Sequence, residues 1–215
     1  MTPTKTLCIA ITLLCSVAAS GQNDPAAKAI LDKVSAKFKT LITVQANYNL
    51  NVTNRAGKNA GKKNGSIMLK GQKYKITDKS MEITSDGRKI WKFEPSANEV
   101  TISNVDNNAG GITPQKLFTN FYDKDFTYKL KGTAKVGTRT LSEIELTPVD
   151  KTKNFQKVLV YVDQVQQMIV SSKIFENSGN VYDYSISNLK TNAPLADNLF
   201  TFDKTKYAGV DEIIQ

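Results

Sequence analysis

The spacing of apolar residues predicts an amphipathic helix near the start of the chain. Apolar side chains recur at intervals of three and four residues at Ala29, Ile30, Val34, Phe38 and Leu41. This is the period at which one face of an α-helix repeats. Asp24 and Pro25 stand directly before this run, and Asp at the N-cap followed by Pro in the first turn is a typical helix start.

After the helix the period changes to two. Ala46, Tyr48, Leu50 and Val52 alternate with polar residues, which indicates a half-buried β-strand. The polar stretch 53–64, which contains Gly57 and Gly61, offers nothing to bury, and we expect a mobile hairpin loop there.

Further short strands are expected along the rest of the chain. They fall at residues 66–70, 73–77, 81–84, 89–94, 99–102, 126–130, 141–146, 157–162, 168–175 and 181–189, with a last short run at 200–202. Turn-forming pairs such as Asp86-Gly87 and Pro95-Ser96 separate neighbours, so the strands can pair as antiparallel hairpins.

The strand pattern stops once, at an Asn/Gly cluster in residues 106–111. Thr113-Pro114 then begins a second short helix that carries Leu117, Phe118 and Phe121. The sequence therefore predicts a mainly β fold with about ten to eleven antiparallel strands in one strongly curved sheet, because long sheets twist and curl. The two helices are the elements available to cover its inside. An ordinary packed core remains the alternative to a ligand cavity at this point.

The first twenty residues read as a secretory signal peptide. Lys5 precedes an apolar run at 7–19, and Ala18, Ala19 and Ser20 form a small-residue cleavage region. Residues 21–215 are expected to be a single exported domain. The run is too short to span ~30 Å of hydrocarbon as a membrane anchor. Lipidation is disfavoured because Cys8 and Cys15 each follow a leucine, where a small residue is required.

The cysteine and histidine content limits the kinds of active site and metal site that the chain can form. Both cysteines lie in the leader and the chain has no histidine, so disulfides, thiol or Ser-His nucleophiles and thiolate or imidazole zinc sites are excluded from the exported domain. We expect no cofactor, no metal and no enzymatic activity. The competing interpretation is a glycosidase with paired carboxylates, for which the candidates are Glu82, Asp86, Glu94, Glu143 and Glu145. All of them fall at turns or at outward positions of predicted strands.

The chain is basic. Its net charge is +9, and loss of Lys5 with the leader leaves +8, which favours anionic membranes or acidic partners. Nucleic acid is disfavoured by export and because the lysines are spread along the chain rather than clustered.

Several ordered segments resemble the periplasmic outer-membrane lipoprotein carrier family, LolA. The most specific is the Ser-Asp-Gly turn, Trp-x-aromatic strand and proline turn at residues 85–100. Residues 43–50, 65–70, 113–118, 144–148, 200–202 and 209–211 resemble other family segments in the same order. The resemblance implies an incomplete β-barrel with a helical lid. It also implies a periplasmic carrier of lipoprotein acyl chains that works between an inner-membrane ATP-driven extractor and an outer-membrane acceptor, and we expect a monomer.

The resemblance, combined with the strand pattern, assigns the candidate site. The expected cavity wall consists of Tyr48, Leu50, Val52, Met68, Tyr74, Met81, Ile83, Trp91 and Phe93. The expected lid contacts are Leu117, Phe118 and Phe121. The family often has an Arg-Pro pair after its second strand, whose arginine holds the lid closed. Here residues 70–74 lack an arginine, which leaves Lys70 as the candidate latch.

One functional alternative has the same fold. A lipid-binding or acyl-chain-sensing module would use the same half-barrel without handing its ligand to an acceptor. An assay of transfer, rather than of binding, separates the two hypotheses.

Overall fold

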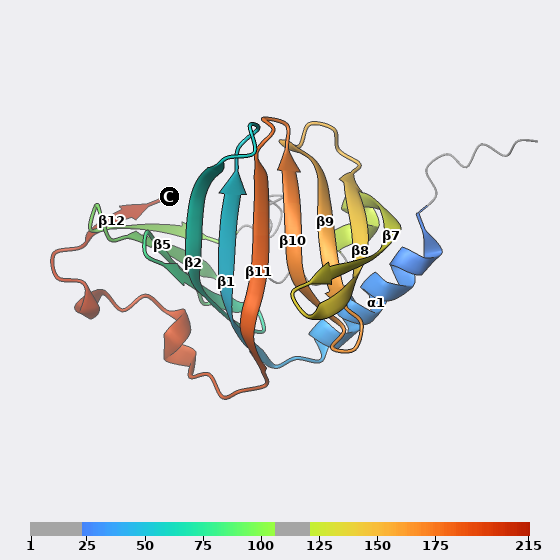
Figure 1. The fold of residues 1–215 in the computed structure, drawn as a ribbon. Helices are drawn as coiled ribbons and strands as arrows, with labels where there is room; N and C mark the ends of the chain where they lie inside the picture. Colours follow the sequence, from blue (N-terminus) through green and yellow to red (C-terminus); the bar gives the residue numbers. More distant parts are fainter. Residues whose placement is uncertain (1–22, 106–120) are drawn as a thin grey trace, which may run out of the picture.

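The computed structural model describes residues 23–105 and 121–215, which form one open β-sheet (Figure 1). Twelve strands are hydrogen-bonded in the order β12-β6-β5-β4-β3-β2-β1-β11-β10-β9-β8-β7. All neighbours are antiparallel except β12, which runs parallel to β6. The edge strands β7 and β12 do not pair with each other, so the curved sheet does not close into a barrel. This confirms the expected fold class, with one strand more than the expected ten to eleven.

Eleven of the twelve strands form two meanders. The first contains β1 (Thr43–Thr53), β2 (Asn59–Lys70), β3 (Lys73–Asp78), β4 (Glu82–Ser85), β5 (Lys89–Glu94) and β6 (Glu99–Asn104). The second contains β7 (Phe126–Val136), β8 (Arg139–Pro148), β9 (Phe155–Asp163), β10 (Met168–Glu176) and β11 (Val181–Thr191). Pairing of β1 with β11 joins the two meanders into one sheet.

Helix α1 (Pro25–Lys39) begins where the sequence predicts. The carboxylate of Asp24 accepts hydrogen bonds from the backbone N–H groups of Ala26 and Ala27. Its second oxygen accepts the N–H of Leu130 on β7. The N-cap residue therefore stabilises the first turn of α1 and also fixes the helix to the edge of the sheet.

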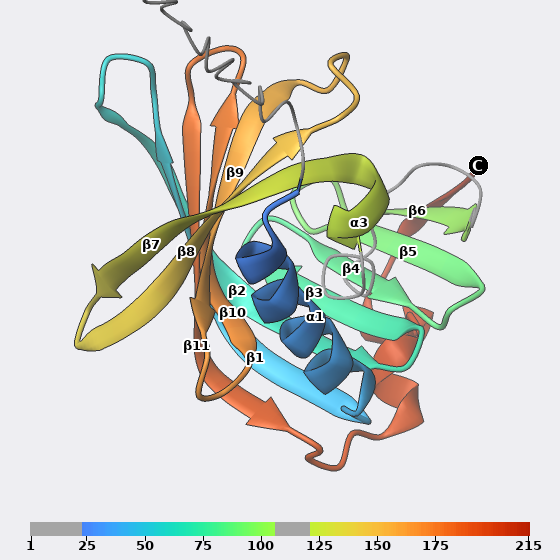
Figure 2. The same cartoon turned by 90° about the vertical axis from the view of Figure 1, so that its right-hand side faces the viewer.

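Helix α1 lies in the hollow of the curved sheet (Figure 2). Its buried residues Ala27, Leu31 and Val34 pack against β7, β8 and β9, where Ile144, Leu146 and Val162 are fully buried. At its other end, Phe38 packs with residues of β1, β2, β3 and β10. We call the face that α1 covers the inner face of the sheet.

The chain after β11 crosses the outer face of the first meander (Figure 1). This segment, residues 192–210, contains the 3-10 helices η1 (Asp197–Phe200) and η2 (Lys204–Lys206) and leads into β12 (Asp211–Ile214). We call it the C-terminal strap. Phe202, Tyr207 and Val210 of the strap pack against β5 and β6 in a small core of their own.

Two local expectations were wrong, and one strand was not predicted. The polar stretch 53–64 is mostly strand, because backbone pairing such as Asn51 with Lys62 extends the hairpin beyond the apolar core. The run 200–202 begins with the last residue of the 3-10 helix η1 and does not form a strand. Strand β12 had no sequence signal, since its side chains are all exposed and it forms only by pairing with distant β6.

The expected internal helix begins outside the described residues. They resume at Phe121, the first residue of the short helix α3 (Phe121–Asp125). Among the described residues, no helix has the length and apolar content needed to cross a membrane.

Candidate functional site

The strand register decides which side chains share the inner face with α1. Side chains alternate along a strand, and directly paired residues of neighbouring strands lie on the same face. Val44 of β1 and Leu69 of β2 are paired, and both pack with Phe38 of α1. These two positions therefore mark the inner face, and the register extends it across the sheet.

Five of the nine expected wall residues are on this face. Tyr48, Leu50 and Val52 follow Val44 at every second position of β1. Tyr74 pairs with Leu69, and Ile83 pairs with Ile76 two positions further along β3. The structure thus brings together the residues that the alternation in β1 suggested.

Met68, Trp91 and Phe93 lie on the opposite, outer face. Met68 is adjacent to inner-facing Leu69, so its side chain points the other way. Trp91 pairs with Thr84, the neighbour of inner-facing Ile83, and Phe93 follows Trp91 at the next position on the same side. The structure therefore does not place these three residues with Tyr48 and Leu50.

The C-terminal strap explains why apolar residues occupy the outer face here. The ring centroid of Phe93 lies 4.3 Å from that of Tyr207 and 5.8 Å from that of Phe202. Phe202 and Tyr207 stack on each other at 4.7 Å. Trp91 packs at the margin of this cluster. In this part of the sheet the outer face carries apolar side chains as well as the inner face, so an aromatic residue does not reveal which face it occupies.

The remaining expected residues are less informative. Met81 lies in the turn before β4, where its backbone N–H donates to Asp78 Oδ1. Leu117 and Phe118 lie outside the described residues. Phe121 begins α3, but its side chain is also outside the description.

Lys70 contacts the strap instead of the inner face. Its Nζ donates to the carbonyl oxygen of Leu195 at 2.8 Å and pairs with the carboxylate of Asp197 at 2.7 Å. Lys73 reaches the other oxygen of Asp197 at 3.1 Å. Both lysines therefore fasten the strap to the outer face of β2 and β3.

Sequence reasoning missed the inner-facing residues of β10 and β11. Tyr184 pairs with Leu50, Ile186 with Tyr48, and Tyr182 with Val52, while Ile174 of β10 pairs with Tyr182. The spacing of two residues between 182, 184 and 186 was the signal available for them. Together they form an inner-face strip whose members are Tyr48, Leu50, Val52, Ile174, Tyr182, Tyr184 and Ile186.

The inner-face strip is apolar and incompletely covered. Leu50 is buried at 9% exposure, and the other six side chains are half-buried. Within the described part of the chain, none of the seven packs into the two core clusters beneath α1. A row of half-buried isoleucine, valine and tyrosine side chains on a concave face is suited to an apolar guest.

The hydroxyl groups of Tyr48 and Tyr184 stay uncharged at neutral pH. The hydroxyl of Tyr48 donates to Asp78 Oδ2 at 3.2 Å, and burial followed by the charge of Asp78 raises the pKa of Tyr48 to about 12. Burial also raises the pKa of Tyr184. These two tyrosines therefore offer hydroxyl groups but no charge to a ligand.

The carboxylates considered for a glycosidase have structural partners. Glu82 pairs with Lys75 at 2.8 Å, and Glu145 pairs with Lys157 at 3.1 Å. Glu94 pairs with Lys92 on the same strand. Asp86 caps a turn by accepting the backbone N–H groups of residues 88 and 89, and Glu143 accepts from the hydroxyl of Tyr161.

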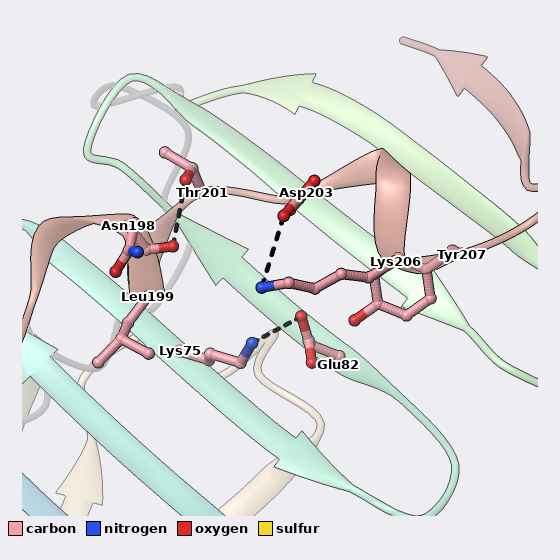
Figure 3. A pocket seen from close by; sticks show the side chains of 8 residues that line it. All are labelled: Lys75, Glu82, Asn198, Leu199, Thr201, Asp203, Lys206 and Tyr207. Atoms are coloured by element: carbon pink, nitrogen blue, oxygen red, sulfur yellow. Dashed lines mark hydrogen bonds and ion pairs between the residues drawn. The ribbon is translucent and has the colours of Figure 1, made fainter.

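Two pockets lie away from the strip. Figure 3 shows one between the strap and the outer face, with a volume of about 80 Å³. Its charged side chains form the ion pairs Lys75–Glu82 and Lys206–Asp203, so their charges cancel within each pair. The other, of about 220 Å³, lies where α1 ends and is lined by Phe38, Leu41 and Val44 among others. Both are smaller than the roughly 300–1,000 Å³ of typical small-molecule sites.

Comparison with known proteins shows the family of this chain. The family model described as "Outer membrane lipoprotein carrier protein LolA" matches residues 39–203. The chain belongs to the LolA family. The match runs from the last turn of α1 to the C-terminal strap, so it includes the strands that carry the inner-face strip.

Curated relatives of the LolA family match most of the chain. An outer-membrane lipoprotein carrier protein of Legionella pneumophila (strain Lens) is 24% identical over 85% of this chain and 88% of its own length. The outer-membrane lipoprotein carrier protein of Haemophilus influenzae (strain Rd) is 28% identical over 79% of this chain and 80% of its own.

Solved structures share the fold. An uncharacterized conserved protein from Thermus thermophilus aligns with a TM-score of 0.59 and 11% identity, covering 88% of this chain and 99% of that one. The Mycobacterium tuberculosis lipoprotein LppX aligns with a TM-score of 0.52 and 15% identity, covering 81% of this chain and 99% of that one. At these identities the likeness concerns the fold alone.

Proposed function

We propose that this chain is a periplasmic carrier that binds the acyl chains of lipoproteins on the inner face of its sheet and takes them from the inner to the outer membrane. The observation that carries the proposal is the inner-face strip. Its surface is mainly apolar and six of its seven side chains are half-buried, although α1 covers the neighbouring part of the same face. The names of the curated relatives, outer-membrane lipoprotein carrier proteins, support this cargo.

Incomplete covering is what a carrier requires. Three acyl chains of ~16 carbons, fully buried at about 0.8 kcal/mol per methylene, would gain more than about 35 kcal/mol. Affinities saturate near ~20 kcal/mol, and a cargo held so tightly would not leave. An open sheet encloses a chain only in part, so the cargo can be released.

The expected partners follow from the same proposal. An inner-membrane ATP-driven extractor would load the carrier, and an outer-membrane acceptor would unload it. Binding and release need only a hydrophobic surface and no bond chemistry, so the carrier works without catalysis. We propose that it acts as a monomer.

The test uses a triacylated lipoprotein and its non-acylated form. Mixed with the exported domain in buffer without detergent, the acylated form is expected to remain soluble in a stoichiometric complex, and the non-acylated form is expected to elute alone. Ile186→Glu places a charge in the strip, whereas Ser185→Glu places one on the outer face of the same strand. We expect more than about tenfold weaker complex formation for the first variant, since an unpaired charge is costly to desolvate.

Two results would contradict the proposal. One is the absence of a soluble complex with the acylated form. The other is equal loss of binding in both variants while circular dichroism shows both folded. Handover of the cargo to acceptor-bearing vesicles distinguishes a carrier from a module that only senses acyl chains.

A further inference from the structure

The hairpin between β1 and β2 ends in a concentrated positive charge. Arg55, Lys58, Lys62 and Lys63 lie within nine positions of one another, and no Asp or Glu occurs between Asp32 and Asp78. We call residues 54–64 with these four side chains the basic tip. All four side chains are exposed.

The basic tip does not use its charges to stabilise the fold. Elsewhere in the described residues ten lysines form ion pairs, as Lys70 and Lys73 do with Asp197. None of the four tip cations has an ion pair in the described part of the chain, and Lys63 Nζ donates a hydrogen bond to the hydroxyl of Ser80 at 3.4 Å. Like charges held close together repel each other, so the tip carries a small cost that the fold itself does not recover.

The backbone holds the tip as a defined projection. Cross-strand pairing continues through Asn51 with Lys62 and Val52 with Gly61. Arg55 lies against Gly179 in the turn between β10 and β11. A Cβ atom added to Gly179 would lie 2.9 Å from both Cβ and Cγ of Arg55. The tip therefore stands at one end of the sheet beside the β10–β11 turn, at the top of Figure 1.

The same end of the sheet is where the inner-face strip ends. Val52 pairs with Gly61 at the base of the tip on one side and with Tyr182 of β11 on the other. A surface that contacts the basic tip consequently lies next to the last apolar residues of the strip. The basic tip and the inner-face strip therefore lie next to each other at this end of the sheet.

We propose that the basic tip docks the protein on the surface of an anionic phospholipid bilayer. Protein interfaces are anchored by buried aromatic or other large side chains, and between its cations the tip has only small or polar residues such as Ala56, Gly57 and Ala60. An anionic membrane needs no anchor pocket, because each Lys or Arg near it is attracted by the surface potential. The docking goes beyond the proposed carriage of lipoproteins and does not depend on it, since the tip is present without cargo.

The experiment measures partition of the cargo-free domain onto vesicles. Vesicles of phosphatidylcholine containing phosphatidylglycerol are compared with vesicles of phosphatidylcholine alone, by co-sedimentation at low salt. We expect binding only to the anionic vesicles, and loss of binding near ~1 M salt, where the Debye length is about 3 Å.

Paired variants locate the docking surface. Lys58→Gln with Lys62→Gln removes two charges from the tip, and Lys129→Gln with Lys135→Gln removes two exposed charges from β7 at the sheet edge. At about fivefold per cation, the tip variant is expected to bind about 25-fold more weakly, and the edge variant less than about fivefold.

Two other outcomes would overturn the proposal that the basic tip docks on the membrane. Equal loss in the two variants would mean that net charge, not the tip, attracts the membrane. No binding to anionic vesicles at low salt would leave the tip as a solvated hairpin or a contact for an acidic protein. Neither result would affect the carrier proposal, whose test contains no vesicle until handover.

Discussion

The hydroxyl of Tyr48 on β1 donates a hydrogen bond to the carboxylate of Asp78 on β3, across the intervening strand. The three positions Tyr48, Gly65 and Asp78 are in register. Because Gly65 of β2 has no side chain, the ring of Tyr48 can lie over it and reach Asp78. This arrangement fixes the orientation of the first tyrosine in the inner-face strip.

Gly65→Ala is expected to destabilise the protein by about 1–3 kcal/mol, the usual cost of overpacking. Its Cβ would overlap the carbonyl oxygen of Thr77 and would come within 2.8 Å of the Tyr48 ring. Urea denaturation measures the change in free energy of unfolding. Gly61→Ala on the same strand is the matched control, because nothing lies within 4 Å of that position. Equal effects of the two substitutions would refute the crowding argument.

Alkaline pH is expected to weaken the fold, partly through Tyr48. Its pKa is about 12 in the folded protein, against about 10 for an unperturbed tyrosine. Above pH ~10 the unfolded state has lost this proton and the folded state has not, so stability falls as pH rises and the fall levels off above ~12. In Tyr48→Phe the decline in urea midpoint between pH ~9 and ~11 should be smaller. An unchanged decline would mean that other groups account for it.

Asp197→Asn is expected to loosen the C-terminal strap without unfolding the sheet. The substitution removes the carboxylate that Lys70 and Lys73 share. Hydrogen exchange should become faster at the amides of η1 and η2, while the denaturation midpoint changes little because these groups are partly exposed. Glu94→Gln removes the exposed pair with Lys92 and should leave exchange in the strap unchanged. A uniform increase over all strands would instead indicate global destabilisation.

The single tryptophan is expected to report on the strap rather than on ligand. Trp91 packs with the outer-face cluster that includes Phe202 and Tyr207, on the face opposite the strip. Binding of acyl chains should leave its fluorescence maximum unchanged, and Phe202→Ala should shift the maximum to longer wavelength by exposing the indole. A clear shift on loading the wild-type protein with acylated lipoprotein would place the cargo on the outer face.

Local signals predicted the fold well. Asp24 and Pro25 begin α1, and the turns at Asp86-Gly87 and Pro95 enclose β5 at the predicted residues. Cap and turn chemistry depends only on neighbouring residues, so sequence alone reveals it. The polar half of β2 and the whole of β12 were missed because they are held by pairing with other strands, which no local pattern encodes.

The candidate site was predicted only in part, for a related reason. Alternation located Tyr48, Leu50 and Val52, because β1 is polar on its other face. It could not assign Trp91 and Phe93, because the strap covers the outer face of β5 and makes both faces partly apolar. A strand read in isolation carries no information on which of its faces the rest of the chain will cover.

The pairing of β1 with β11 has a consequence for how the newly made chain folds. The backbone N–H of Ile42, just before β1, donates a hydrogen bond to the side-chain Oδ1 of Asn192, just after β11. The two residues are 150 positions apart in the sequence. As the chain emerges N-terminus first, the hydrogen-bonding edge of β1 stays open until almost the whole polypeptide has followed, and such long-range closure is slow. An open edge can pair with other chains, so the interval before β11 arrives is when this protein is most exposed to aggregation.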